Sequence, residues 1–145
     1  MAFSGTYITT AVSISAGLPS TNNAAGFNAL TFTTIIGCMM WGETGDMSED
    51  ISDMGLDGRK FHLSGGLDGG LIQFKFRTDL LDAGQILMKS LNNLTTNCSV
   101  KLLEPNNAKE WSTGLIANIR ALPREATAYQ GFTGEFRVNT AGVIG

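Results

Sequence analysis

The most constraining feature of this sequence is repeated apolar–polar alternation, the period-2 pattern of a strand with one buried face. The cleanest run is Leu71–Arg77, in which Ile72, Phe74 and Phe76 alternate with polar residues. Turn-forming residues such as Pro105-Asn106-Asn107 separate the runs. The pattern predicts a mainly β fold, with further strands in 6–15, 29–35, 98–103, 112–122 and 129–139.

Three of these runs allow side chains to be assigned to a face. In the last run, Phe132, Gly134, Phe136 and Val138 are expected to face the core. In the run before it, strict alternation places Ile116, Asn118, Arg120 and Leu122 on one face. In 29–35, Leu30, Phe32 and Ile35 suit a buried face.

One segment has helical periodicity instead. Thr78 or Asp79 can cap its start, and Asp82 would add negative charge in the first turn. The apolar stripe consists of Leu80, Leu81, Gly84, Leu87, Met88 and Leu91. One helix among strands predicts a β-sandwich or barrel flanked by a helix.

The segment 38–70 has a different composition. It contains eight of the 18 glycines, seven of the 13 acidic residues and four of the six methionines. Neither helical nor strand periodicity runs through it, apart from a short strand expected at Lys60–Leu63. Loops of this length are uncommon in compact domains and are usually functional. We therefore expect an extended, adaptable arm at about 38–70.

The overall composition excludes several classes of protein. With 145 residues and 43% hydrophobic residues, the chain can bury the core of a single folded domain (1–145). The ten basic residues are scattered and the net charge is −3, which disfavours direct binding to nucleic acid. Residues 1–17 lack the pattern of a secretion signal, and no apolar run is long enough to span a membrane. For Cys38 and Cys98, two reduced and buried thiols are favoured over the alternative, a structural disulfide in an oxidising compartment.

Catalytic and metal-binding patterns are poorly matched. His62 is the single histidine and has no nucleophile motif around it, so we expect no enzyme activity and no cofactor. Asp46, Asp50 and Asp57 occupy positions 1, 5 and 12 of a calcium-loop spacing. Ile51, however, stands where that loop needs glycine. A solvated acidic loop is therefore favoured over a calcium site.

Flexible thioethers and a tryptophan in a glycine-rich arm suit a contact between protein subunits that repacks on binding. The alternative is that these side chains fold back onto their own core. The candidate contact residues are Met39, Met40, Trp41, Met47, Met54, Arg59 and Lys60.

Three segments carry a family resemblance. Leu18–Gly37, reading LPSTNNAAGFNALTFTTIIG, resembles the N-terminal signature of the tail tube (major tail) proteins of long-tailed, non-contractile bacteriophages. Thr78–Leu87, reading TDLLDAGQIL, is similar to that family's helix start, and Gly131–Val138 is similar to its closing strand. The segment Cys38–Trp41 departs from the family pattern.

The resemblance implies a structural virion protein whose subunit, a β-sandwich or half-barrel with one flanking helix, closes a larger β-barrel when hexameric rings form. The rings would stack into a hollow tail tube that delivers DNA into the host, without specific DNA binding. Implied partners are further copies of the chain, a tape measure protein, and tail terminator and distal tail proteins. The implied location is the virion tail, after synthesis in the bacterial cytoplasm. The alternatives are the inner tube of a contractile tail or related injection device, and a calcium-dependent binding module.

Overall fold

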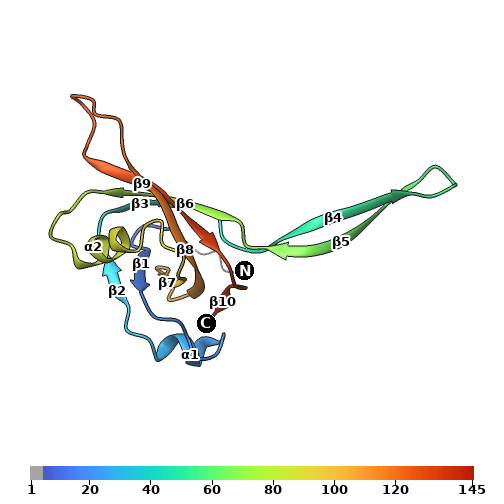
Figure 1. Cartoon of the computed structure of the whole chain (residues 1–145), viewed down its shortest axis with the longest axis horizontal. Helices are drawn as coiled ribbons and strands as arrows, with labels where there is room; N and C mark the ends of the chain where they lie inside the picture. Colours follow the sequence, from blue (N-terminus) through green and yellow to red (C-terminus); the bar gives the residue numbers. More distant parts are fainter. Residues whose placement is uncertain (1–4) are drawn as a thin grey trace.

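The computed structural model describes residues 5–145. Residues 1–4, which begin the segment where no secretion signal is expected, lie outside the described residues. The described chain is mainly β, as predicted, with a sheet, a separate two-stranded hairpin and two helices (Figure 1). The sheet strands are β1 (Ala11–Ser15), β2 (Thr33–Ile35), β3 (Cys38–Trp41), β6 (Leu71–Arg77), β7 (Cys98–Leu103), β8 (Lys109–Ala121), β9 (Gly131–Val138) and β10 (Val143–Ile144). The helices are α1 (Ala24–Asn28) and α2 (Ala83–Ser90).

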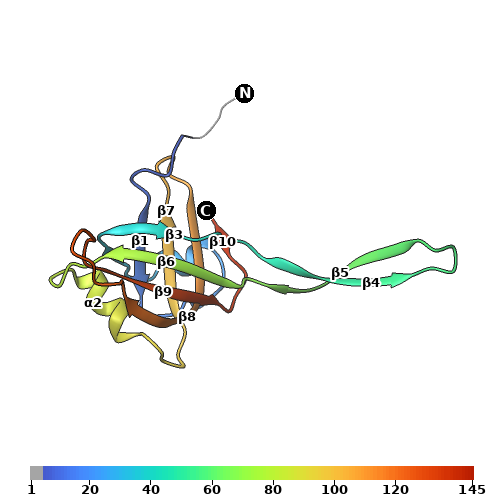
Figure 2. The ribbon, with the colours of Figure 1, turned by 90° about the horizontal axis from the view of Figure 1, so that it is seen from above.

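The sheet is antiparallel, and its order is β2-β1-β7-β8-β9-β6-β3, with β10 paired to β8. β2 and β3 stand at the two ends of this order, yet only Ile36 and Gly37 separate them along the chain. The chain therefore brings the two ends of the sheet together, which produces a half-barrel. In Figure 2, β3, β6 and β9 form the near layer and β1, β7 and β8 run across behind it.

The core lies between these layers and follows the alternation in the sequence. Ile72, Phe74 and Phe76 of β6 are buried, as are Phe132 and Phe136 of β9. Neighbouring rings in this group pack with centroids about 5.5 Å apart, a distance typical of favourable aromatic pairs. The predicted inward faces of these two strands are confirmed.

The predicted face of β8 is wrong because the strand contains a bulge. The pairing with β9 shifts register between Ala117 and Arg120, and Asn118 has a left-handed φ of 56°. A bulge moves the side chains beyond it to the opposite face. Ile116 therefore faces the core, whereas Arg120 lies opposite Thr133 on the outer face.

The predicted start of α2 is also wrong. The helix begins at Ala83, and Asp82 is its N-cap, with its carboxylate accepting from Gln85 N at 3.1 Å. Leu80 and Leu81, which were expected in the buried stripe, precede the helix and are 77% and 91% exposed. The buried side of α2 consists of Gly84, Gln85 and Met88.

The segment before β2 forms a short helix rather than a longer strand. Asn23 caps α1 by accepting from Gly26 N at 2.8 Å. Phe27 is fully buried and stacks on Trp111 of β8, with ring centroids 5.9 Å apart. The predicted strand at 29–35 is reduced to β2, and of its expected buried residues only Ile35 is fully buried.

The expected arm is not an irregular loop. β3 joins the sheet, and β4 (Met47–Met54) and β5 (Lys60–Asp68) form an antiparallel hairpin that projects from one end of the molecule (Figures 1 and 2). The expected strand at Lys60–Leu63 is the first part of β5. Among residues 5–145, neither helix is long and apolar enough to cross a membrane.

Candidate functional site

The projecting hairpin, Met47–Asp68, has two unlike faces. Ile51 lies opposite Leu63, and Asp53 lies opposite Phe61. Side chains directly opposite each other share a face, and alternate residues along a strand share it too. Glu49 joins this face, because a Cβ on Gly65 would lie 3.3 Å from Glu49 Cβ and 3.0 Å from Ile51 Cδ1. The apolar face of the hairpin consists of Met47, Ile51, Phe61 and Leu63, with the acidic residues Glu49, Asp53 and Asp68 among them.

The opposite face is mostly polar. His62 lies opposite Ser52, and its Nδ1 is 3.0 Å from Asp50 Oδ2. Every residue of β4 is exposed, and β5 is exposed except for Gly65. A two-stranded hairpin alone in water is marginally stable at best. The apolar face therefore needs a surface to cover it, and the body of this chain does not supply one.

Three of the predicted contact residues lie on β3. Met39 and Met40 are about half exposed, whereas Trp41 packs into the core and stacks on Phe74 at 5.4 Å. For Trp41 the alternative interpretation, packing onto its own core, matches the structure. Met39 and Met40 line an open groove of about 930 Å³ that also includes Tyr7 and Ile8. Three glutamates also line this groove: Glu43, Glu104 and Glu110.

The other four predicted contact residues belong to the hairpin. Met47 is at its base, opposite Asp68, and is 73% exposed. Met54 lies opposite Lys60 near the tip, and Arg59 occupies the turn. These exposed positions are compatible with a contact to another subunit, which stays a prediction.

The sequence reasoning missed Ile51, Phe61 and Leu63, which form most of the apolar face. Their signal is a short alternation, Phe61 and Leu63 in β5 with Ile51 across the hairpin. The register shift between Ser48 and Asp50 interrupts this alternation towards the hairpin base. The remaining apolar alternation is hard to recognise in the sequence, because acidic residues and glycines surround it.

The calcium hypothesis does not match the geometry. Asp46 precedes β4 and Asp57 follows it, so an extended strand separates two carboxylates that would have to converge on one ion. Asp50 contacts His62, and Asp57 accepts from Arg59 N. Within residues 5–145, no three His, Cys, Asp or Glu side chains are grouped closely enough to hold a metal ion.

At the end of the sheet away from the hairpin, hydrogen bonds of Asp82 and Gln85 join α2 to the corner between β2 and β3. We call this set of hydrogen bonds the lock. Asp82 accepts from Ile36 N at 3.0 Å. Gln85 Nε2 donates to Ile36 O at 2.6 Å and to Arg77 O at 2.8 Å, while its Oε1 accepts from Asp79 N at 2.9 Å. These residues are part of the family-like motif at Thr78–Leu87. Asp82 and Gln85 of this motif therefore have a structural role.

The lock leaves an apolar cluster in solvent, which we call the corner patch: Ile36, Leu80, Leu81 and Ile86. All four are more than half exposed. They come from the β2–β3 corner and from the start of α2, the two segments that Asp82 and Gln85 join. Exposed apolar clusters of this kind mark sites of contact with other proteins.

The fold groups basic residues that are scattered in the sequence. Lys75, Arg120 and Arg137 lie on the outer face of β6, β8 and β9. Among the described residues, the one arginine or lysine in an ion pair is Arg137, whose Nε is 3.1 Å from Glu135 Oε2. Hydrogen bonds from Asn118 and Arg137 lower the pKa of Glu135.

Neither cysteine forms a disulfide among the described residues. Cys98 is buried and Cys38 is partly buried against the same core. Burial raises the pKa of both thiols to about 11. The burial expected from the sequence is confirmed for Cys98, and the reduced state of the two thiols stays a prediction.

Comparison with solved structures shows a shared fold. The chain resembles a chain in the sheath–tube complex of PVC, an extracellular contractile injection system, in its extended state. The TM-score is 0.61 at 8% identity, covering 94% of this chain and 87% of that one. It also resembles a chain of the 6-fold symmetrised baseplate of the anti-feeding prophage (AFP), with a TM-score of 0.64 at 13% identity, covering 97% and 95%. No protein-family model and no curated protein sequence matches the chain.

Proposed function

We propose that this chain is a structural subunit that assembles into the inner tube of a contractile injection device. The observation that carries the proposal is the fold shared over nearly the whole chain with a protein of a contractile sheath–tube complex. This likeness favours the contractile alternative over the tail tube of a non-contractile phage. The functional unit is the tube itself, and the proposal assigns the chain no enzyme activity.

The geometry supports self-assembly. The hairpin exposes an apolar face at one end of the molecule, and the corner patch is exposed at another. β3 is the last strand of the sheet order, so one of its edges has no strand partner in the described chain. Unpaired edges and uncovered apolar faces are liabilities for a monomer, and both are satisfied when copies associate.

The symmetry of the assembly depends on whether the surfaces in contact are alike or different. A contact between two different patches is heterologous, and it produces closed rings or open stacks according to the rotation. We infer hexameric rings, in keeping with the 6-fold symmetry of the AFP baseplate. We assign the arm, including Met39, Met40, Met47, Met54, Arg59 and Lys60, to contacts between copies.

Sedimentation and negative-stain microscopy of the purified full chain test the proposal. We expect hollow tubes or stacked rings, either spontaneously or after seeding. A matched variant with 47–68 replaced by a short glycine turn should keep the fold of the body but lose the stacks. A wild-type chain that stays monomeric at millimolar concentration, with and without seeds, contradicts the proposal.

A further inference from the structure

We propose that the apolar face of the hairpin docks on the corner patch of a second copy of this chain. The inference rests on the proposed function, because it identifies the surfaces through which the tube subunits meet. It also predicts the direction of assembly, with the hairpin of one copy against the α2 end of the next.

The two surfaces are both apolar and both uncovered. Ile51, Phe61 and Leu63 of the hairpin are 52–69% exposed, and Leu80 and Leu81 are 77% and 91% exposed. Large apolar side chains placed together at one site lose free energy when water is removed from them. Neither surface has a partner within the described part of the chain.

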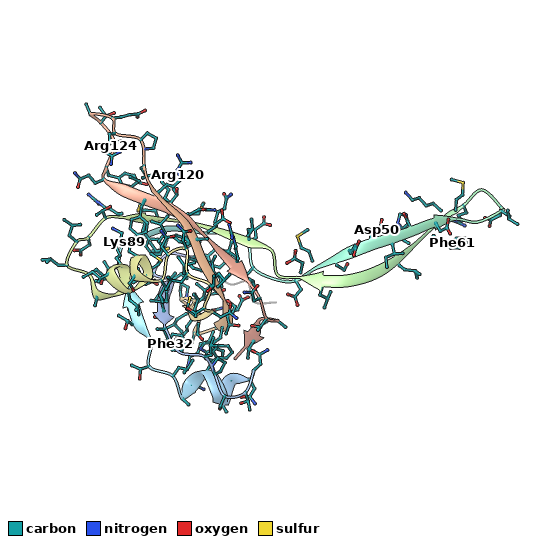
Figure 3. The ribbon with its side chains drawn as sticks, viewed as in Figure 1. Phe32, Asp50, Phe61, Lys89, Arg120 and Arg124 are labelled. Atoms are coloured by element: carbon teal, nitrogen blue, oxygen red, sulfur yellow. The ribbon has the colours of Figure 1, made fainter. Side chains whose placement is uncertain are left out.

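The two surfaces lie at opposite ends of the molecule. In Figure 3, Asp50 and Phe61 of the hairpin lie at one end of the molecule, and Lys89, Arg120 and Arg124 lie at the other. Figure 1 places α2 at that second end, below the β8–β9 loop. A copy cannot reach its own corner patch with its own hairpin, so the contact joins two copies and can be repeated without end.

The two surfaces also carry opposite charge. The hairpin contains five carboxylates and two basic residues, Arg59 and Lys60, and Glu49 and Asp53 belong to its apolar face. The α2 end has two exposed carboxylates, Asp79 and Glu125, because Asp82 is buried as the helix cap. Its basic residues outnumber them: Arg77, Lys89, Arg120 and Arg124, none of which forms an ion pair within residues 5–145.

Charge also excludes the groove beside β3 as the docking surface. That groove exposes Tyr7, Ile8 and Met39, so on apolar area alone it would compete with the corner patch. Its glutamates Glu43 and Glu104 would face the carboxylates of the hairpin. Like charges brought together at an interface suppress that pairing.

Disulfide trapping tests the inference. A chain that carries both Leu63→Cys and Leu81→Cys should form a ladder of linked copies on a non-reducing gel after mild oxidation of assembled protein. The control chain carries Leu63→Cys with Met39→Cys, which tests the groove. Chains with only one of these substitutions measure any crosslinking through the native Cys38 and Cys98. Each of them should give dimers at most.

A ladder from the Leu63–Leu81 pair, and none from the Leu63–Met39 pair, supports the inference. Tubes without that ladder, or a ladder from the Leu63–Met39 pair alone, overturn it and leave the proposed function intact. If the wild-type chain forms no assembly, the proposed function fails first, and the inference fails with it.

Charge reversal provides a second, independent test. Lys89→Glu with Arg124→Glu should raise the protein concentration needed for assembly about tenfold. Adding Glu49→Lys with Asp53→Lys on the hairpin should restore assembly. Failure of this second pair to restore assembly, in a chain whose circular dichroism is native, counts against the docking surface.

Discussion

Replacing Gln85 by methionine tests whether the lock at the β2–β3 corner holds the body together. Gln85 is 1% exposed, and methionine has a similar length but cannot make the three hydrogen bonds to Ile36, Arg77 and Asp79. Each lost hydrogen bond costs about 1 kcal/mol net, so the free energy of unfolding should fall by about 3 kcal/mol. The helix would then lose its main polar connection to the sheet.

Urea unfolding followed by tryptophan fluorescence measures this loss, because Trp41 and Trp111 are both packed in the body. With a slope of about 2 kcal/mol per molar urea, the midpoint should fall by about 1.5 M. The matched control is Ile86→Met, one residue along and 56% exposed, for which we expect a change below about 0.5 kcal/mol. A Gln85→Met variant within about 0.5 kcal/mol of wild type refutes the lock.

Three further predictions follow from the packing. Gly84→Ala should lower the thermal midpoint strongly, because its Cβ would lie 2.7 Å from the Cα of Ile35 in β2, whereas Gly66→Ala enters open space and should be neutral in the same melting assay. Trp41→Ala should cost about 3–5 kcal/mol of unfolding free energy in urea, and a cost below about 1 kcal/mol would contradict its place in the core. Alkylation of Cys38 and Cys98 at pH 8 should be roughly 100-fold slower in the folded chain than in urea, since their pKa is raised from 9.0 to about 11. The same shift means that folding stability falls as pH rises from 9 through 11, because the unfolded chain ionises these thiols first.

Much of the body could be predicted from the sequence because its strands alternate without interruption. β6 and β9 satisfy this condition, and their inward residues were identified correctly. The alternation of β8 is interrupted, because the inserted residue near Asn118 changes the face of every later side chain. The helix start was misplaced because Thr78, Asp79 and Asp82 are all good caps, and only the contacts of Asp82 with Ile36 and Gln85 decide between them.

The hairpin could not be predicted for a different reason. Its residues have low intrinsic strand propensity, with acidic side chains and glycines throughout. Cross-strand pairs such as Ile51 with Leu63 determine its conformation, and such pairs join residues that are distant along the chain. The corner patch escaped prediction as well, because Leu80 and Leu81 fit the stripe of a helix that begins after them.

Cryo-electron microscopy of the assembled wild-type chain would show directly whether the hairpin joins the subunits of a tube. We expect a hollow tube of stacked rings, in which density for Met47–Asp68 of each copy crosses to a neighbouring copy and ends against α2. A solid filament without a channel contradicts the claim. So does a tube in which the hairpin folds back on its own body.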